Sequence, residues 1–247
     1  PENVVALTTL PLSQDEQLVF IASEMPGNGV DTRFYFCRLK EDGGSFQVVE
    51  NWQMIATDSP PELSSRLVFS LAAIQTNNGF QLFAGTEAGL YWFDGQWHHV
   101  QIGLTPTPLF QVGVTPSSQL MVAGRNVLRT YALPLSANAN PSTLIGENGL
   151  NGVYVMTASP RGNAWLAGLG AGNVRRFDGG SWSEQVVNNP ARLTVYDLLS
   201  GDDGNLYAGT SDGVYWYSAN SWQPLRYQLL SGWQVHLLNN QPVLSLC

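Results

Sequence analysis

A motif that recurs about every 40 residues constrains the fold of this chain more than any other feature of its sequence. Two copies are nearly alike, residues 79–97 (GFQLFAGTEAGLYWFDGQW) and residues 204–222 (GNLYAGTSDGVYWYSANSW). A third copy spans residues 162–182, and a more divergent fourth spans residues 119–131. Successive aligned alanines lie 39, 44 and 41 residues apart, at Ala84, Ala123, Ala167 and Ala208. This spacing is that of a four-stranded propeller blade, about 40 to 45 residues.

The pattern inside each copy predicts strands rather than helices. Apolar or alternating runs of five to seven residues are separated by clusters of Gly, Asn, Asp, Ser and Pro, as in short strands joined by tight turns. No stretch keeps the apolar period of an amphipathic helix over about eleven residues. In the last copy we expect strands at residues 194–199, 206–209 and 214–217, and an outer strand that begins at Ser221.

Two recurring features have predicted places in such a blade. The Ala-Gly pair of each second strand is expected near the propeller axis, where small side chains let neighbouring sheets approach. The aromatic residues Trp97, Trp182 and Trp222 are expected to fill the wider gaps between blades farther out, because each can bury roughly 150–250 Å².

The repeat therefore predicts an all-β fold, a single β-propeller domain of four-stranded antiparallel blades. We expect five complete blades and a partial sixth, at about residues 1–52, 66–102, 109–146, 152–188, 193–228 and 232–247. The remaining strands of the sixth blade are expected from elsewhere in a larger chain, or the tail packs against the first blade to close the ring.

The first blade is longer than the others. The second-strand residues Ala22 and Ala84 are 62 residues apart, about 20 more than the period of a blade. We expect the extra residues in two loops, 24–31 and 53–65, and the outer strand of this blade at residues 45–50. Loops longer than about 12 residues are often functional, so the 53–65 loop is a candidate binding element.

Charge and composition exclude several classes of partner. The formal net charge is -8, and Lys40 is the only lysine, which argues against nucleic acid or an anionic membrane as the main partner. The longest apolar stretch, residues 67–74, is far shorter than the roughly 20 residues of a membrane span. Cys37 and Cys247 form no metal-binding motif. Two free thiols are favoured, and a single long-range disulfide is the alternative.

Residues 204–217 (GNLYAGTSDGVYWY) and 79–93 resemble the propeller repeat of the two-component-regulator type. The resemblance covers most of the chain as a repeating pattern. It implies an extracytoplasmic sensor domain, of the kind that often recognises glycan fragments and is fused to signalling modules. No kinase or other effector motif lies in these 247 residues, so a signalling context is implied by the resemblance alone.

The residue types that carry chemistry elsewhere do not form a catalytic set here. His98 and His99 are adjacent, and adjacent residues of a strand point to opposite faces, which places them poorly for one metal ion. The loop residues Asp202, Asp203 and Asp212 lack the ligand spacing of an EF-hand. No nucleophile-elbow sequence is present. We predict no catalytic residue, no metal site and no cofactor.

Departures from the repeat indicate where a ligand could bind. The third-strand aromatic pairs of two copies are replaced in another copy by two arginines. Paired guanidinium groups suit bidentate recognition of an anion or a carboxylate. The alternative is that the arginines extend beside an acidic loop to reach solvent. The candidate ligand-binding residues are Arg175, Arg176, Tyr91, Trp92, Tyr215 and Trp216.

These features favour a non-catalytic recognition or sensor domain of a larger protein, binding a protein segment or a small ligand such as a glycan on a loop-built face. A lectin-like propeller is the main alternative, because low charge, abundant Asn and Gln and eight tryptophans suit contacts with sugars. Exposed Trp-plus-Asn pockets would favour a lectin, and burial of Trp97, Trp182 and Trp222 would count against it. A propeller hydrolase and a structural subunit of an assembly are the further alternatives.

Overall fold

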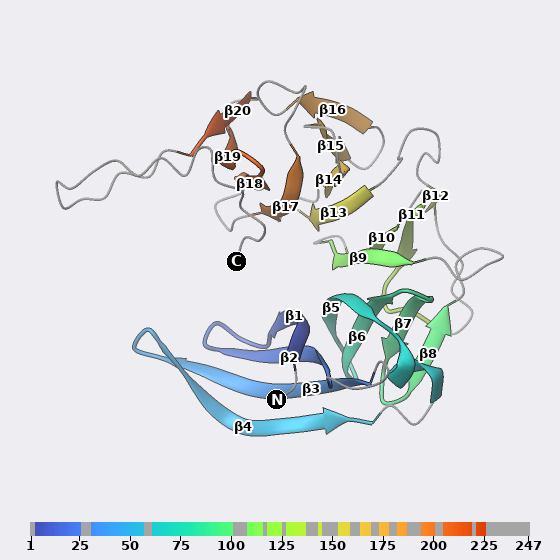
Figure 1. Ribbon diagram of the computed structural model, residues 1–247. Coiled ribbons are helices and arrows are strands. Elements are labelled where there is room, and N and C mark those ends of the chain that lie inside the picture. Colours follow the sequence, from blue (N-terminus) through green and yellow to red (C-terminus); the bar gives the residue numbers. More distant parts are fainter. Residues whose placement is uncertain are drawn as a thin grey trace. The chain divides into compact units, whose positions relative to one another are not determined.

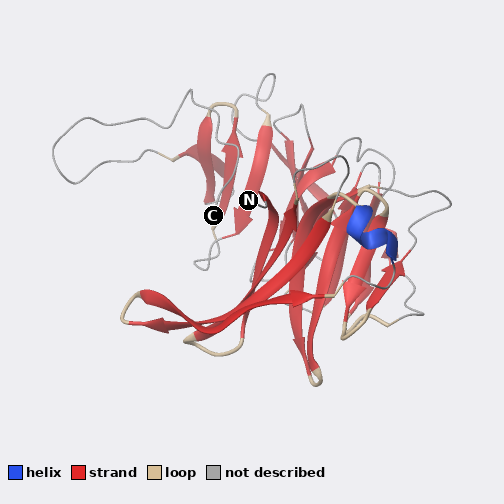
Figure 2. Cartoon of the chain, turned by 60° about the horizontal axis from the view of Figure 1, so that its bottom comes forward, coloured by secondary structure: helices blue, strands red, loops and turns tan. Residues whose placement is uncertain are grey.

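The computed structural model describes most of the first half of the chain and separate strands of the second half. The described residues are 3–25, 31–56, 61–100, 108–115, 118–124, 127–136, 143–144, 153–158, 164–168, 173–177, 182–186, 194–200, 205–218 and 221–225. They form β-strands and one short 3-10 helix, η1 (Pro61–Ser65) (Figure 2). The predicted partial sixth blade, 232–247, lies outside the described residues.

The described strands form five four-stranded antiparallel sheets, in each of which the strands follow one another in chain order (Figure 1). The first sheet contains β1 (Asn3–Pro11), β2 (Glu16–Glu24), β3 (Thr32–Asp42) and β4 (Ser45–Ile55). The second contains β5 (Val68–Thr76), β6 (Gly79–Thr86), β7 (Gly89–Phe93) and β8 (Trp97–Val100). The third contains β9 (Leu109–Val114), β10 (Gln119–Gly124), β11 (Val127–Ala132) and β12 (Thr143–Leu144).

The last two sheets have the same order. The fourth contains β13 (Val153–Ala158), β14 (Ala164–Gly168), β15 (Asn173–Phe177) and β16 (Trp182–Val186). The fifth contains β17 (Val195–Ser200), β18 (Leu206–Thr210), β19 (Gly213–Ser218) and β20 (Ser221–Pro224). The first three sheets form one compact unit and the last two form another. The prediction of five complete four-stranded blades is confirmed.

The repeated Gly-Thr-x-x-Gly sequence folds into the hairpin between the second and third strands. Thr86 Oγ1 donates a hydrogen bond to the Gly89 carbonyl (2.9 Å) and accepts one from the Ala88 N–H (3.1 Å). Thr210 Oγ1 makes the same pair of bonds with the Gly213 carbonyl (2.8 Å) and the Asp212 N–H (3.1 Å). Both glycines have positive φ, 127° and 115°, a conformation that residues with a side chain rarely adopt.

Within each unit, consecutive sheets pack through their first strands: β1 on β5, β5 on β9, and β13 on β17. Hydroxyl groups connect these strands, because the Val112 N–H donates to Ser70 Oγ (2.9 Å) and the Ser200 N–H donates to Thr157 Oγ1 (3.3 Å). Contact between first strands is the arrangement expected of neighbouring propeller blades.

The Ala-Gly pair allows this close approach, as predicted. Ala84, Ala123 and Ala208 are completely buried. A Cβ atom added to Gly85 would lie 2.8 Å from the carbonyl oxygen of Leu109, the first residue of β9 in the next sheet. Real Cβ contacts are essentially never this short, so the position requires glycine.

Two of the three predicted inter-blade tryptophans are buried. Trp97 is 5% exposed and packs on Phe34 of the first sheet, with ring centroids 4.6 Å apart. Trp222 is 7% exposed and belongs to a core cluster with Val174 of the fourth sheet. The predicted gap-filling role is confirmed for these two residues. The side chain of Trp182 lies outside the described residues.

The extra length of the first blade is used mainly to lengthen its strands. Strands β2, β3 and β4 have 9, 11 and 11 residues, whereas β6, β7 and β8 have 8, 5 and 4. The predicted end of the outer strand at residue 50 and the predicted start of the loop at residue 53 are wrong, because β4 continues to Ile55. In the rest of the predicted loop, residues 61–65 form η1 and residues 57–60 lie outside the described residues. Pairing with the long β3, rather than local sequence, extends β4.

Candidate functional site: the open face of the first sheet

The register of the first sheet assigns its side chains to two faces. On one face, Phe20, Phe34 and Ile55 belong to a buried cluster shared with the second sheet. Side chains alternate along a strand, so the residues next to these lie on the other face. One row on that face crosses all four strands: Leu7 opposite Ile21, Ile21 opposite Tyr35, and Tyr35 opposite Met54.

This second face, here called the open face, is exposed along its flanking strands β1 and β4. Between them Ile21 and Tyr35 are half-buried, and Val19 and Cys37 are 8% and 1% exposed. The most exposed residues are Met54 (63%), Val4 (58%), Leu7 (58%), Phe46 (57%), Val48 (56%) and Trp52 (49%). Among the described residues, ten large hydrophobic side chains are exposed, and nine of them lie in the first sheet or at Met25, which directly follows β2. Exposed apolar side chains concentrated in this way are typical of interaction sites.

Strand β4 borders the open face and is the outer strand of the sheet (Figure 1). Ten of its eleven residues are exposed, all except Ile55. The outer strands of the other sheets have 4, 2, 5 and 4 residues. Strand β4 contains no proline, lysine or arginine, the residues that usually protect an edge from pairing. A bulge near residues 49–52 interrupts its regular pairing with β3.

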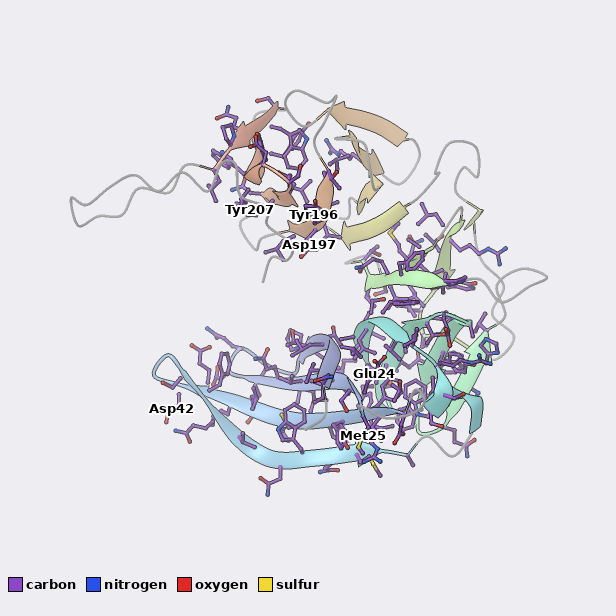
Figure 3. All side chains as sticks on the ribbon, viewed as in Figure 1. Glu24, Met25, Asp42, Tyr196, Asp197 and Tyr207 are labelled. Atoms are coloured by element: carbon purple, nitrogen blue, oxygen red, sulfur yellow. The ribbon has the colours of Figure 1, made fainter. Side chains whose placement is uncertain are left out.

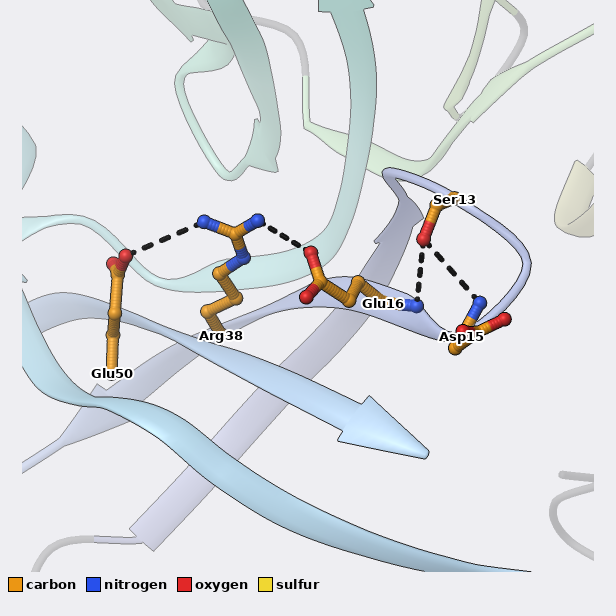
Figure 4. A network of polar contacts seen from close by, with 5 residues as sticks. All are labelled: Ser13, Asp15, Glu16, Arg38 and Glu50. Atoms are coloured by element: carbon orange, nitrogen blue, oxygen red, sulfur yellow. Dashed lines mark hydrogen bonds and ion pairs between the residues drawn. The ribbon is translucent and has the colours of Figure 1, made fainter. Parts of the chain in front are cut away.

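Two basic residues near β4, Arg33 and Arg38, are bound by carboxylates. Arg38 contacts Glu16 on β2 and lies 3.5 Å from Glu50 on β4 (Figure 4). The hydrogen bond with Glu16 is the main cause of a raised Arg38 pKa. Arg33 lies 3.1 Å from Asp31, and its pKa is raised by a hydrogen bond with Tyr35 and then by Asp31. Both guanidinium groups are therefore neutralised locally.

The end of the β3–β4 hairpin is acidic. Glu41 and Asp42 close β3, and both are exposed. Asp42 lies at the tip of the hairpin, where it accepts a hydrogen bond from Gln47 Nε2 (3.3 Å) (Figure 3). Lys40, the only lysine of the chain, precedes them. The open face thus combines an apolar surface with an excess of negative charge at one end of its outer strand.

The first predicted ligand residues are packing residues in this structure. Tyr91 and Trp92 on β7 are 0% and 2% exposed. Their rings stack on His99 and His98 of β8, at centroid distances of 4.4 and 4.2 Å. Neither ring is at the surface, so a ligand would have to displace a histidine to reach one.

In the fifth sheet, Tyr215 is 5% exposed and its hydroxyl donates to Asp212 Oδ2 (3.0 Å). Burial, then this hydrogen bond, raises the pKa of Tyr215 to about 12. Trp216 is half-buried and lies opposite Tyr207 on β18. Tyr215 therefore supports the β18–β19 hairpin through Asp212.

The two predicted arginines follow one another on β15, where Arg175 is opposite Glu184 and Arg176 is opposite Ser183 on β16. The side chain of Arg175 lies outside the described residues. The six predicted positions occupy the third strands of three different sheets. A ligand site at these positions stays a prediction.

The open face was not predicted from the sequence. Its signal was present in residues 45–55 (SFQVVENWQMI), where six large apolar residues occupy an outer strand. The predicted loop at 53–65 included Met54 but not the other exposed residues. The exposure of this strand becomes visible only when its neighbours are placed.

No known protein family and no curated protein matches the sequence. Several solved structures match the fold. The extracellular domain of a hybrid two-component system of B. thetaiotaomicron matches with a TM-score of 0.58 and 13% identity, over 90% of this chain and 28% of that one. PorZ, a bacterial surface component of the type-IX secretion system of Porphyromonas gingivalis, matches with a TM-score of 0.62 and 17% identity, over 93% of this chain and 36% of that one.

An enzyme shares the fold as well. A catalytically inactive virginiamycin B lyase from Staphylococcus aureus matches with a TM-score of 0.59 and 10% identity, over 89% of this chain and 68% of that one. The chain is a β-propeller. The likeness to propeller domains of two-component systems, first seen in the repeat, is confirmed at the level of the fold. That fold occurs both in the extracellular domain of a two-component system and in a lyase.

Two further properties concern the described part of the chain alone. None of its helices has the length and apolar character to cross a membrane. Its His, Cys, Asp and Glu side chains form no group of three that could hold a metal ion.

Proposed function

We propose that this propeller is a non-catalytic recognition module of a larger, extracytoplasmic protein, and that it binds a polypeptide segment on the open face of its first sheet. The observation that carries the proposal is the concentration of nine of the ten exposed large hydrophobic side chains in and beside that sheet. Burying an apolar surface of this kind under a partner lowers the free energy of the complex.

The comparisons support the modular part of the proposal. The chain spans 28% of the two-component-system chain and 36% of PorZ, so a propeller of this size makes up only part of each of those chains. One of these proteins is an extracellular domain and the other a bacterial surface component. These contexts favour a module that presents a binding surface outside the cytoplasm.

A polypeptide partner is favoured over a glycan. Sugar binding by propellers of this composition would use exposed tryptophan rings, yet Trp97 and Trp222 are buried between sheets. Trp52 is half-exposed, and the other exposed large hydrophobic residues of its strand are Phe46, Val48, Val49 and Met54. Aliphatic and thioether side chains suit apolar peptide side chains better than sugar hydroxyls.

The test is selection of peptides from a phage-displayed library of random 12-residue peptides, followed by binding measurements on variants of the whole chain. Trp52→Ser should weaken the selected peptides about tenfold or more, because tryptophans at the centre of an interface contribute strongly to binding. Gln53→Ser is the matched control, since Gln53 is also exposed on the same strand but lies opposite Phe36 on the other face.

Two results would contradict the proposal. If selected peptides bound both variants as tightly as the original chain, the binding site would lie elsewhere. If no peptide were enriched and a glycan array gave binding that Trp52→Ser abolished, a lectin would be the better interpretation. Unfolding midpoints of both variants should match the original, which confirms that neither substitution acts through stability.

A further inference from the structure

We infer that the partner of the open face is an extended segment that adds a fifth strand to the first sheet along β4, and that this segment is apolar at alternate positions and basic at one end. This inference rests on the proposed function and specifies its partner. Addition of a strand to a sheet edge supplies main-chain hydrogen bonds for affinity and side-chain contacts for specificity.

The first argument is that the outer edge of β4 is long and has no paired strand among the described residues. Among the described strands, β4 pairs only with β3, which leaves its other edge without a strand. It is more than twice as long as the described outer strands of four or five residues in the other sheets. Proteins usually shorten an outer strand, place lysine or proline on it, or bend it with a bulge to prevent pairing. Strand β4 is long and has no lysine or proline, and of these protections it has the bulge near residues 49–52.

The second argument is the direction of the side chains. A strand added beside β4 would continue the cross-strand rows of the sheet, because facing residues in neighbouring strands project to the same face. The row of Leu7, Ile21, Tyr35 and Met54 is apolar throughout. Alternate side chains of the added strand would therefore extend an apolar surface, and the segment must be apolar at every second residue.

The bulge of β4 limits where regular pairing can occur. Residues 45–48 and 53–55 keep regular register with β3, whereas the bulge lies between them. Each regular stretch is long enough for a few ladder positions. We therefore expect the strongest protection by a bound segment at residues 45–48 and 53–55, with the exposed ring of Trp52 between them.

The third argument is charge. Arg33 and Arg38 are held by carboxylates, and Glu41 and Asp42 lie exposed at the end of the hairpin. With Lys40 counted, the three exposed charged residues 40–42 carry a net charge of -1, from one lysine and two acids. A segment with lysine or arginine at that end is therefore complementary. The net charge of -8 makes a second copy of this chain a poorer occupant.

The experiment measures binding of the synthetic peptide Val-Thr-Val-Thr-Val-Thr-Val-Lys-Lys, with blocked ends, to the whole chain by fluorescence anisotropy at low salt. In a strand added antiparallel to β4, its C-terminal lysines would lie at the Ser45 end, near Glu41 and Asp42. A peptide with glutamate in place of both lysines should bind about tenfold more weakly. In the variant Glu41→Lys/Asp42→Asn, the difference in affinity between the lysine and the glutamate peptide should become smaller or change sign. In Gln53→Ser, this difference in affinity should be the same as in the original chain.

Main-chain pairing is tested separately. N-methylation of the peptide at every second residue removes the amide hydrogens of one edge, and the two possible sets should differ at least tenfold in affinity. Hydrogen–deuterium exchange of residues 45–55 should slow when the unmodified peptide binds. If both N-methylated peptides bind equally while Trp52→Ser still abolishes binding, the added strand is refuted and the proposed function stands. If Trp52→Ser has no effect, the proposed function fails.

Two other occupants are distinguishable outcomes that would overturn the inference. Occupancy by a second copy would appear as a dimer in sedimentation velocity that Trp52→Ser converts to a monomer. Occupancy by residues 226–247 of the same chain would appear as slow exchange of residues 45–55 without any peptide, and as no binding of the basic peptide.

Discussion

Replacing Gln81 with methionine should destabilise the first unit, because this side chain joins the second sheet to the segment that follows β11 of the third sheet. Gln81 lies on β6 and is 5% exposed. Its Nε2 donates to the carbonyl of Leu135 (2.9 Å), and its Oε1 accepts from the N–H of the same residue (2.8 Å). Methionine fills nearly the same volume, so the variant Gln81→Met removes two hydrogen bonds without opening a large cavity.

The loss of unfolding free energy in Gln81→Met can be estimated from the N–H and the carbonyl of Leu135, the two backbone groups that lose their partners. Leu135 is 3% exposed, and a buried donor or acceptor without a partner costs about 1–3 kcal/mol. If both backbone groups stayed buried without a partner, the total cost would be up to roughly 6 kcal/mol. The neighbouring residues Pro134 and Ser136 are exposed, so the segment can shift toward water, and new hydrogen bonds to water then offset part of that cost. We expect a loss of about 2–4 kcal/mol.

The assay is urea unfolding followed by tryptophan fluorescence. With a slope near 2 kcal/mol/M, the midpoint should fall by about 1–2 M. The control is Gln75→Met, at an exposed position of β5, which should change stability by less than about 0.5 kcal/mol. If Gln81→Met changed the unfolding free energy by no more than the control does, the two hydrogen bonds would not contribute to stability and the reasoning would be refuted.

The variant Gln81→Glu adds a pH-dependent version of the same test. An ionised glutamate could still accept from the Leu135 N–H but would have no proton for the carbonyl, so the folded state favours the protonated acid. Its folded pKa should therefore lie above the unfolded value of about 4.3. The variant should be most stable below that pH and lose stability as the pH rises through the folded pKa. A pH-independent loss would contradict this assignment.

Two further predictions concern the repeated motif. Gly85→Ala should cost about 1–3 kcal/mol in urea unfolding, because its Cβ would meet the Leu109 carbonyl at 2.8 Å in a contact that must shift; unchanged stability would show that β9 moves away freely. Tyr215→Phe should cost about 0.5–1.5 kcal/mol near neutral pH through loss of the bond to Asp212,. Because the Tyr215 pKa is raised to about 12, above an ordinary value of about 10, this contribution should be complete below pH 10 and disappear as the pH rises through 12; a constant difference between the two proteins up to that pH would argue against the hydrogen bond.

Much of the fold follows from local patterns in the sequence. The Gly-Thr-x-x-Gly turn forms its own hydrogen bonds through Thr86 and Thr210, so each copy of the motif specifies a hairpin wherever it occurs. The spacing of the aligned alanines then sets the number of complete blades. The close approach at Gly85 follows from the same motif, since only glycine leaves room for the next sheet.

The prediction of the binding residues depends on a difference between repeats, which is weaker evidence than a recurring motif. Tyr91 and Trp92 stood out because two arginines replace the equivalent pair in another copy, but both rings are covered by histidines of β8. A difference between repeats shows that two environments differ. It does not show which of them faces solvent, because the covering residues come from another strand.

The sequence by itself determined the all-β class, the five complete blades, the hairpin turns and the burial of Trp97 and Trp222 between sheets. Each of these depends on residues close in the chain or on a regular period. Only the tertiary structure decided the length of β4 and the exposure of Phe46, Val48, Trp52 and Met54. Alternation along a strand divides side chains between two faces, but which face is covered depends on the neighbouring sheets, and those are brought together only by the fold.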